Sequence, residues 1–219
     1  MRKLLGVVGA ASLAFTLAAC GSDSSDSAGG ANYVRVLGTE PQQGLIPAMT
    51  NENGGGRIVD MLFSGLVYYD ADGNVHNEMA ESIDKEGDKT YKVTLKPDLK
   101  FSDGSAVTAD SFVDTWNYAV ANEQLNESFF SSIKGYGEGV KEMGGLKVID
   151  ERTFTIELTQ PESDFPSRLG YNAYFPVPAA ALEDPQGFGE SPVSNGSLQD
   201  QGMESQPEPD HRAEPRVQG

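Results

Sequence analysis

The chain has 219 residues, 38% of them hydrophobic and 22% charged, which permits one domain with a buried core or two small domains. Its formal net charge of −17 leaves no basic patch to hold phosphate and argues against nucleic acid as a partner. One cysteine cannot form an internal disulfide, and one cysteine with two histidines supplies neither a zinc site nor a Cys–His nucleophile pair. We therefore expect no metal and no cofactor.

Residues 1–19 have the pattern of an export signal. A basic start precedes an apolar stretch over residues 4–15, which is shorter than the roughly 20 residues of a membrane-spanning helix, and small residues follow. The sequence Leu-Ala-Ala-Cys, ending at Cys20, resembles the lipobox of bacterial lipoproteins. This resemblance implies cleavage before Cys20, a diacylglyceryl thioether on its sulfur, and attachment to the outer face of a membrane through acyl chains.

Composition divides the remaining chain into three parts. Residues 20–31 are rich in Ser, Asp and Gly with nothing to bury, which predicts a flexible tether. Residues 32–196 carry the apolar patterns of a folded domain. Residues 197–219 contain prolines and no lysine and have no apolar periodicity, so we expect a disordered tail, encoded out of frame past a frameshift or junction.

The first half of the domain alternates short elements with turns. Residues 33–37 form a β-rich run, and the Gly- and Asn-rich residues 50–56 indicate a loop before a helix over residues 57–63. No Gly-Lys-Ser/Thr follows these glycines, so they do not indicate a phosphate-binding loop. Residues 66–69 form a predicted strand that ends in a hairpin turn at residues 70–74.

The second half has clearer periodicity. Residues 90–96 alternate apolar and polar side chains, which is typical of a half-buried strand. Thr108 is a candidate N-cap for a helix whose apolar residues share one face. Residues 146–149 and 153–158 flank a turn and predict a second hairpin, and residues 179–182 predict a helical turn.

Two groups of acidic residues have structural explanations that we favour over chemistry. Asp70, Asp72 and Glu81 imitate a calcium-binding loop, but Val75 stands at the position where such a loop needs glycine, so a hairpin turn is expected. Asp103 and Asp110 could form an acid–base pair. Their places in a turn and in the first turn of a helix explain both carboxylates without catalysis.

Residues 62–119 contain, in order, an Asp-x-x-Gly turn, an Ala-Glu-Ser step, an alternating strand, Phe-Ser-Asp-Gly, and Val-Thr-Ala-Asp-x-Phe before a helix with tryptophan. With these motifs the stretch resembles the oligopeptide- and dipeptide-binding proteins of ABC importers, extracellular solute-binding protein family 5. The similarity continues through KVIDERTFTIELTQP and YFPVPAAAL and ends with SPVSNG at Gly196. It covers most of the chain after the signal.

This resemblance implies a mixed α/β fold of the periplasmic-binding-protein-like type II, present as the N-terminal part of the first lobe with its small subdomain. It implies capture of an extended peptide for a membrane permease, without catalysis, and places the carboxylate for the peptide amino terminus in a second lobe outside this chain. Carried over by position, the ligand-side residues are Asn51, Glu52, Asn53, Gly54, and an aromatic contact at Phe129 or Phe130.

Two other functions stay open from the residues alone. A lipid-anchored surface hydrolase would need a nucleophile and a base, and His76 is the one histidine in the domain, in a predicted turn. A surface interaction protein, such as an adhesin or scaffold, would use the same fold without a small ligand and would expose an apolar patch.

Overall fold

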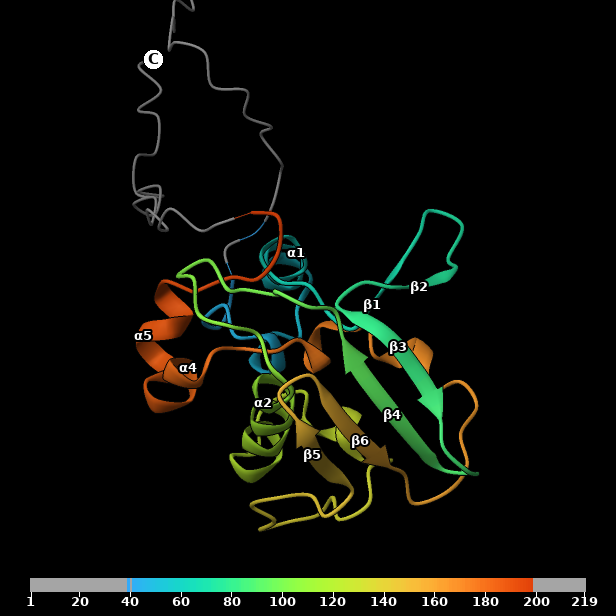
Figure 1. Cartoon of the computed structure of the whole chain (residues 1–219). Helices are drawn as coiled ribbons and strands as arrows, with labels where there is room; N and C mark the ends of the chain where they lie inside the picture. The colour runs from blue at the N-terminus through green and yellow to red at the C-terminus, as the bar shows by residue number, and fades with distance from the viewer. Residues whose placement is uncertain (1–38, 40, 199–219) are drawn as a thin grey trace, which may run out of the picture. The chain divides into compact units, whose positions relative to one another are not determined.

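The fold is built on a four-stranded antiparallel sheet in the order β3-β4-β6-β5 (Figure 1). The computed structural model describes residue 39 and residues 41–198, so the predictions for residues 33–37 and for most of the tail lie outside it. The strands are β3 (Ala80–Lys85), β4 (Thr90–Leu95), β5 (Leu146–Asp150) and β6 (Thr153–Glu157). The β5–β6 hairpin was predicted from alternation, whereas β3 was not predicted.

Strand β4 lies in the middle of this sheet, as its alternating pattern requires. Tyr91, Val93 and Leu95 are buried, and the lysine and threonines between them are half-buried. Val93 is opposite Phe154 of β6 and Ile83 of β3. One face of the sheet is therefore a continuous apolar surface.

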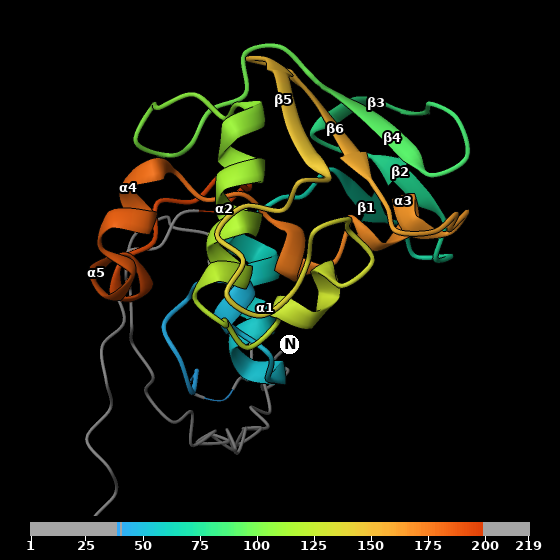
Figure 2. The ribbon, with the colours of Figure 1, turned by 90° about the horizontal axis from the view of Figure 1, so that it is seen from below.

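Helix α2 (Ala109–Ala121) covers that apolar surface (Figure 2). It begins as predicted at Thr108, whose hydroxyl accepts from the backbone N–H of Ser111 while the Ser111 hydroxyl accepts from the N–H of Thr108. Phe112 and Trp116 lie one turn apart, are fully buried, and both contact Phe154 with ring centroids 5.8 Å apart. This contact joins the helix to the sheet.

Trp116 also fixes the segment that follows the sheet. Its indole Nε1–H donates to the backbone carbonyl of Tyr174 over 2.9 Å, and the two rings meet edge to face at 5.5 Å. The Tyr174 hydroxyl donates to the carbonyl of Phe129 over 2.6 Å. Helix α2 therefore positions two loops that are far apart in the sequence.

Helix α1 (Asn53–Leu62) begins earlier than its glycines suggest, so the loop predicted over residues 50–56 is wrong in its second half. The Glu52 carboxylate accepts from the N–H groups of Gly54 (2.7 Å) and Gly55 (2.8 Å) and caps the helix. A Cβ on Gly55 would clash with this carboxylate. The glycines therefore allow a tight cap, which periodicity does not reveal.

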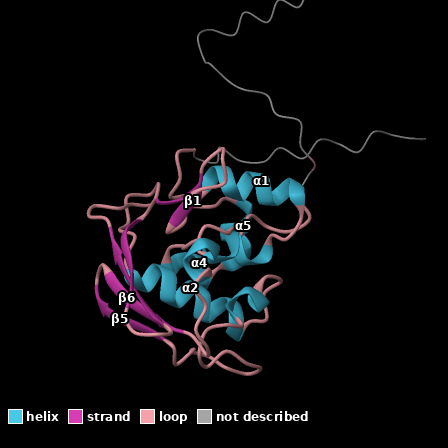
Figure 3. Cartoon of the chain, turned by 90° about the vertical axis from the view of Figure 1, so that its right-hand side faces the viewer, coloured by secondary structure: helices cyan, strands magenta, loops and turns pink. Residues whose placement is uncertain are grey.

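A second apolar cluster lies between α1 and the C-terminal helices (Figure 3). It contains Val59 and Leu62 of α1 together with Phe175 and Phe188. At the end of α1, Asn195 exchanges two hydrogen bonds with the backbone of Ser64, each 3.0 Å long. The SPVSNG motif is therefore fastened to the helix and its following loop.

The remaining elements are short. Strands β1 (Val67–Tyr69) and β2 (Val75–Asn77) form the predicted hairpin, in which His76 lies on a strand and not in the turn. Three small helices, α3 (Phe165–Arg168), α4 (Ala179–Glu183) and α5 (Pro185–Glu190), follow the sheet, and α4 confirms the predicted helical turn. The 3₁₀ helices are η1 (Pro47–Met49), η2 (Glu127–Phe130) and η3 (Asn172–Tyr174). Among the described residues, no helix is both long and apolar enough to span a membrane.

Trp116→Ala should destabilise the chain strongly because it empties a fully buried site and leaves the Tyr174 carbonyl without its donor. We expect a loss of about 3–5 kcal/mol in the free energy of unfolding, measured by urea denaturation. Ile149→Ala is the control, since Ile149 is 61% exposed and should lose under about 0.5 kcal/mol. Equal losses for both variants would contradict the role of Trp116.

Candidate functional site

The loop before α1 and the first residue of α1 each present an asparagine at the surface. Asn51 and Asn53 are exposed, and each amide side chain can donate to a carbonyl and accept from an N–H group. Glu52, between them, is half-buried, and each of its carboxylate oxygens accepts one of the two helix-capping hydrogen bonds. Gly54 is buried, and a Cβ there would clash with the Thr39 side chain. Of these four positions, Asn51 and Asn53 are the two free to meet a ligand.

The buried Asn126 holds this loop beside η2. Its backbone N–H donates to the carbonyl of Ala48 over 3.0 Å, and its side-chain Nδ2 donates to the carbonyl of Thr50 over 3.0 Å. Asn126 is 3% exposed, so these bonds form away from competing water. The structure therefore joins Thr50, the residue before Asn51, to Asn126, which lies three residues before Phe129.

The two phenylalanines of η2 have different environments. Phe130 is completely buried and packs against Trp116 and Tyr174, so its ring belongs to the core. Phe129 is 38% exposed and stacks on Tyr171 with ring centroids 4.3 Å apart. Of the two aromatic candidates, Phe129 is the exposed one.

Sequence reasoning missed Tyr171 and Asn172, which follow α3 and lie beside the expected residues. Tyr171 is 38% exposed and extends the aromatic surface of Phe129, and Asn172 is nearly buried next to the first turn of α1. The one feature of the sequence that could have indicated them is their position just before the motif YFPVPAAAL. Asn51, Asn53, Phe129 and Tyr171 are hereafter the asparagine–aromatic surface.

This surface combines two kinds of contact that suit an extended peptide. Amide side chains can satisfy the N–H and C=O groups of a peptide backbone, and an aromatic pair offers a flat apolar contact that does not require one particular side chain. None of the four residues is charged at neutral pH. Such a surface would bind through the backbone and would tolerate different peptide sequences.

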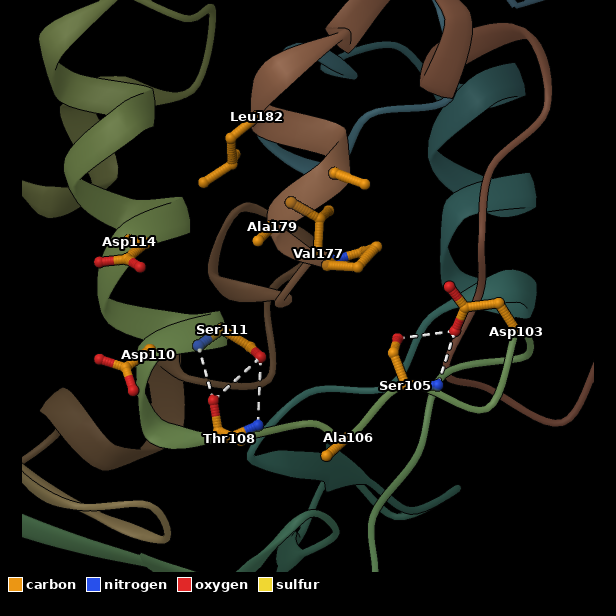
Figure 4. A pocket seen from close by; sticks show the side chains of 12 residues that line it. Asp103, Ser105, Ala106, Thr108, Asp110, Ser111, Asp114, Val177, Ala179 and Leu182 are labelled. Atoms are coloured by element: carbon orange, nitrogen blue, oxygen red, sulfur yellow. Dashed lines mark hydrogen bonds between the residues drawn. The ribbon is translucent and has the colours of Figure 1, made fainter.

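A separate cavity of about 290 Å³ lies between the start of α2 and α4 (Figure 4). It contains Asp103 and Asp110, the two carboxylates considered for catalysis. Asp103 accepts from the N–H (2.8 Å) and hydroxyl (2.6 Å) of Ser105, and these bonds hold the pKa of its carboxyl below the usual range. Thr108 and Ser111 bond each other in the helix cap. Asp103, Ser105, Thr108 and Ser111 thus form local turn and cap structure, while the carboxylates of Asp110 and Asp114 make no hydrogen bond to the other residues drawn.

The acidic turn of the β1–β2 hairpin is also locally bonded. Asp70 accepts from the side chain and backbone of Asn74 and pairs with His76 over 2.7 Å, which holds the pKa of Asp70 well below its usual range. The hairpin predicted in place of a calcium loop is confirmed. In the described part of the chain, no group of three or more His, Cys, Asp or Glu side chains could hold a metal ion.

Comparison with known proteins identifies the class. Residues 74–197 match the model of the bacterial extracellular solute-binding proteins, family 5, in its middle region. The chain belongs to this family, and it is therefore assigned to the exported proteins. The fold is that of periplasmic-binding-protein-like structures, as the sequence resemblance implied.

Curated relatives include two oligopeptide-binding proteins. The chain is 30% identical over 190 residues to OppA of Bacillus subtilis, covering 80% of this chain and 34% of that protein. It is 34% identical over 148 residues to the periplasmic OppA of Escherichia coli, covering 63% of this chain and 26% of that protein. The chain thus spans between about a quarter and a third of the length of these relatives.

Solved structures agree with this assignment. The pheromone receptor PrgZ, whose structure shows a mode of peptide binding, is similar with a TM-score of 0.69 and 29% identity, over 77% of this chain and 36% of that one. OppA of Haemophilus influenzae in complex with the peptide RPPGFSPFR has a TM-score of 0.62 and 28% identity, over 67% and 30%. The relatives in both comparisons are binding proteins.

Glu52→Ala should destabilise the start of α1 because two helix N–H groups lose their acceptor. We expect a loss of about 1 kcal/mol in unfolding free energy, measured by chemical denaturation, and increased amide exchange at Gly54 and Gly55. Glu183→Ala, on the exposed end of α4, is the matched control and should change stability by under about 0.5 kcal/mol. Unchanged exchange at both glycines would contradict the capping role.

Proposed function

We propose that this chain captures oligopeptides outside the cytoplasm as part of the substrate-binding protein of an ABC importer. The observation that supports this proposal is that the resemblance-derived residues Asn51, Asn53 and Phe129 are all exposed, and that Asn126 joins the segment before Asn51 to the one that carries Phe129. The names of relatives, which are oligopeptide- and dipeptide-binding proteins, support peptide as the ligand class.

We further propose that the chain supplies one wall of the peptide site. The relatives are about three times as long as the matched part, and their additional length would supply the opposing wall. A peptide that contacts one wall alone keeps much of its surface in water. Its affinity for the protein depends on how much of that surface is buried. The chain alone would therefore bind weakly, and efficient delivery to a permease would need the second wall.

The division of the chain is part of the same proposal. Residues 1–19 would be removed as a signal peptide, residues 20–31 would link lipid to protein, residues 32–196 would form the binding domain, and residues 197–219 would lie outside it. Cys20, the proposed lipidation site, lies outside the described residues. The described residues do not assemble the nucleophile–base pair that a hydrolase needs, since His76 is bonded to Asp70 and to no serine, threonine or cysteine side chain among them.

The chain should bind short peptides without micromolar affinity. Titration calorimetry with a pool of tripeptides to pentapeptides should give no micromolar isotherm, because one wall cannot bury most of the ligand surface. A longer relative that includes both walls, such as OppA of Escherichia coli, is the positive control for the pool. A clear micromolar isotherm for the 219-residue chain would contradict the one-wall proposal.

Cys20 should carry acyl chains when the protein is made in a bacterium that processes lipoproteins. Mass spectrometry of the membrane-extracted protein should find an N-terminal Cys20 with added diacylglyceryl mass, and Cys20→Ser should release the protein or leave its signal uncleaved. Ser22→Ala, two residues away, is a control that should leave anchoring unchanged. An N-terminal Cys20 without acyl mass would contradict the proposal.

A further inference from the structure

A cavity of about 410 Å³ adjoins the asparagine–aromatic surface and has no assigned role. Four segments line it, namely the C-terminal half of α1 with the loop after it, the β1–β2 hairpin, the residues around Tyr171, and Ser197. Tyr171 lines the cavity and also stacks on Phe129, so one side chain belongs to both features. A ligand on the surface could therefore extend a side chain into the cavity.

The lining of this cavity is negatively charged. Asp60 and Glu78 contribute carboxylates, and no lysine, arginine or histidine is among the lining residues. Glu78 accepts a hydrogen bond from the Ser64 hydroxyl over 3.0 Å, whereas Asp60 takes part in none of the ion pairs formed within the described residues. Asp60 is an exposed residue whose carboxyl is partly buried. This partial burial raises the pKa of the carboxyl above its usual range, and a hydrogen bond from the Asn172 side chain opposes the rise. A positively charged partner would stabilise the ionised form of such a carboxyl.

Asn172, one of the residues that line the cavity, carries a buried amide oxygen. Asn172 is 7% exposed, and its Oδ1 is buried without a hydrogen-bond partner among the described residues. An unsatisfied buried acceptor is unfavourable and is a rare feature of folded proteins. It therefore points to a donor that the described residues do not provide.

We propose that this cavity binds the positively charged end of a lysine or arginine side chain in a peptide held on the asparagine–aromatic surface. Asp60 would pair with the cation, the Asn172 Oδ1 would accept one of its N–H bonds, and the Tyr171 ring would contact its methylene stem. The proposal rests on the proposed function and names a side-chain preference within it. A metal ion fits less well, because the cavity has two carboxylates and no third acidic, histidine or cysteine ligand.

The test compares two tripeptides that differ in one charge. Ala-Lys-Ala and Ala-norleucine-Ala have side chains of similar length, and norleucine lacks the ammonium group. Each is titrated to millimolar concentration into the ¹⁵N-labelled 219-residue chain, and NMR follows the Asn172 side-chain amide and the backbone amides of Asn51 and Phe129. This method measures weak binding, so it does not require the second wall.

We expect both peptides to shift the Asn51 and Phe129 signals, and the lysine peptide alone to shift the Asn172 amide strongly. The lysine peptide should bind about fivefold more tightly, as for a partly screened ion pair. Asp60→Asn should abolish this preference, so that the two peptides bind with about equal affinity. Asp114→Asn, an exposed carboxylate on α2 outside this cavity, should retain it.

Three results would overturn the inference. Equal affinity for the two peptides with shifts at Asn51 and Phe129 would contradict the cation site and leave the proposed function standing. A lysine preference that survives in Asp60→Asn would show that another group recognises the charge. No shift with either peptide would contradict both proposals. Dispersed amide spectra of the variants establish that they are folded, and Asp60→Glu should restore most of the preference.

Discussion

The contact between Trp116 and Tyr174 is the interaction on which the rest of the structure depends. One indole packs on the sheet through Phe154 and donates its N–H to the Tyr174 backbone, while the Tyr174 hydroxyl fastens the carbonyl of Phe129. These hydrogen bonds lie in the buried core, where a donor or acceptor that loses its partner lowers the stability of the fold. The same core that stabilises the sheet thus fixes both loops that carry Phe129 and Tyr171.

Hydrogen bonds from side chains to the backbone hold the part of the surface that carries Asn51 and Asn53. Asn126 donates hydrogen bonds to the carbonyls of Ala48 and Thr50, and the Glu52 carboxylate caps α1. Asn51 and Asn53 therefore lie in a segment that is hydrogen-bonded at both ends. A rigid loop loses little entropy when a ligand binds. The polar contacts for a peptide backbone are therefore supported by groups that do not themselves face the ligand.

The sequence pattern predicted those elements that are determined by residues close to one another in the sequence. The cap at Thr108, the alternation of β4 and the β5–β6 hairpin each depend on neighbouring residues, and all are present. The early start of α1 depends on a glutamate cap that periodicity cannot detect, and β3 contains a register irregularity near Ser82 with a half-polar sequence. Phe129 and Phe130 are adjacent and chemically identical, so their separation into surface and core is decided by tertiary contacts. Tyr171 and Asn172 join the site through Tyr174, a link that no short motif contains.

The central claim is that a peptide lies on the surface formed by Asn51, Asn53, Phe129 and Tyr171. The most direct measurement is photo-crosslinking with a short peptide carrying a benzoylphenylalanine, followed by tandem mass spectrometry of the cross-linked chain. The account predicts light-dependent adducts on residues 51–54, Phe129 and residues 171–172. Adducts concentrated instead on the exposed side of β5, around Ile149, would contradict it.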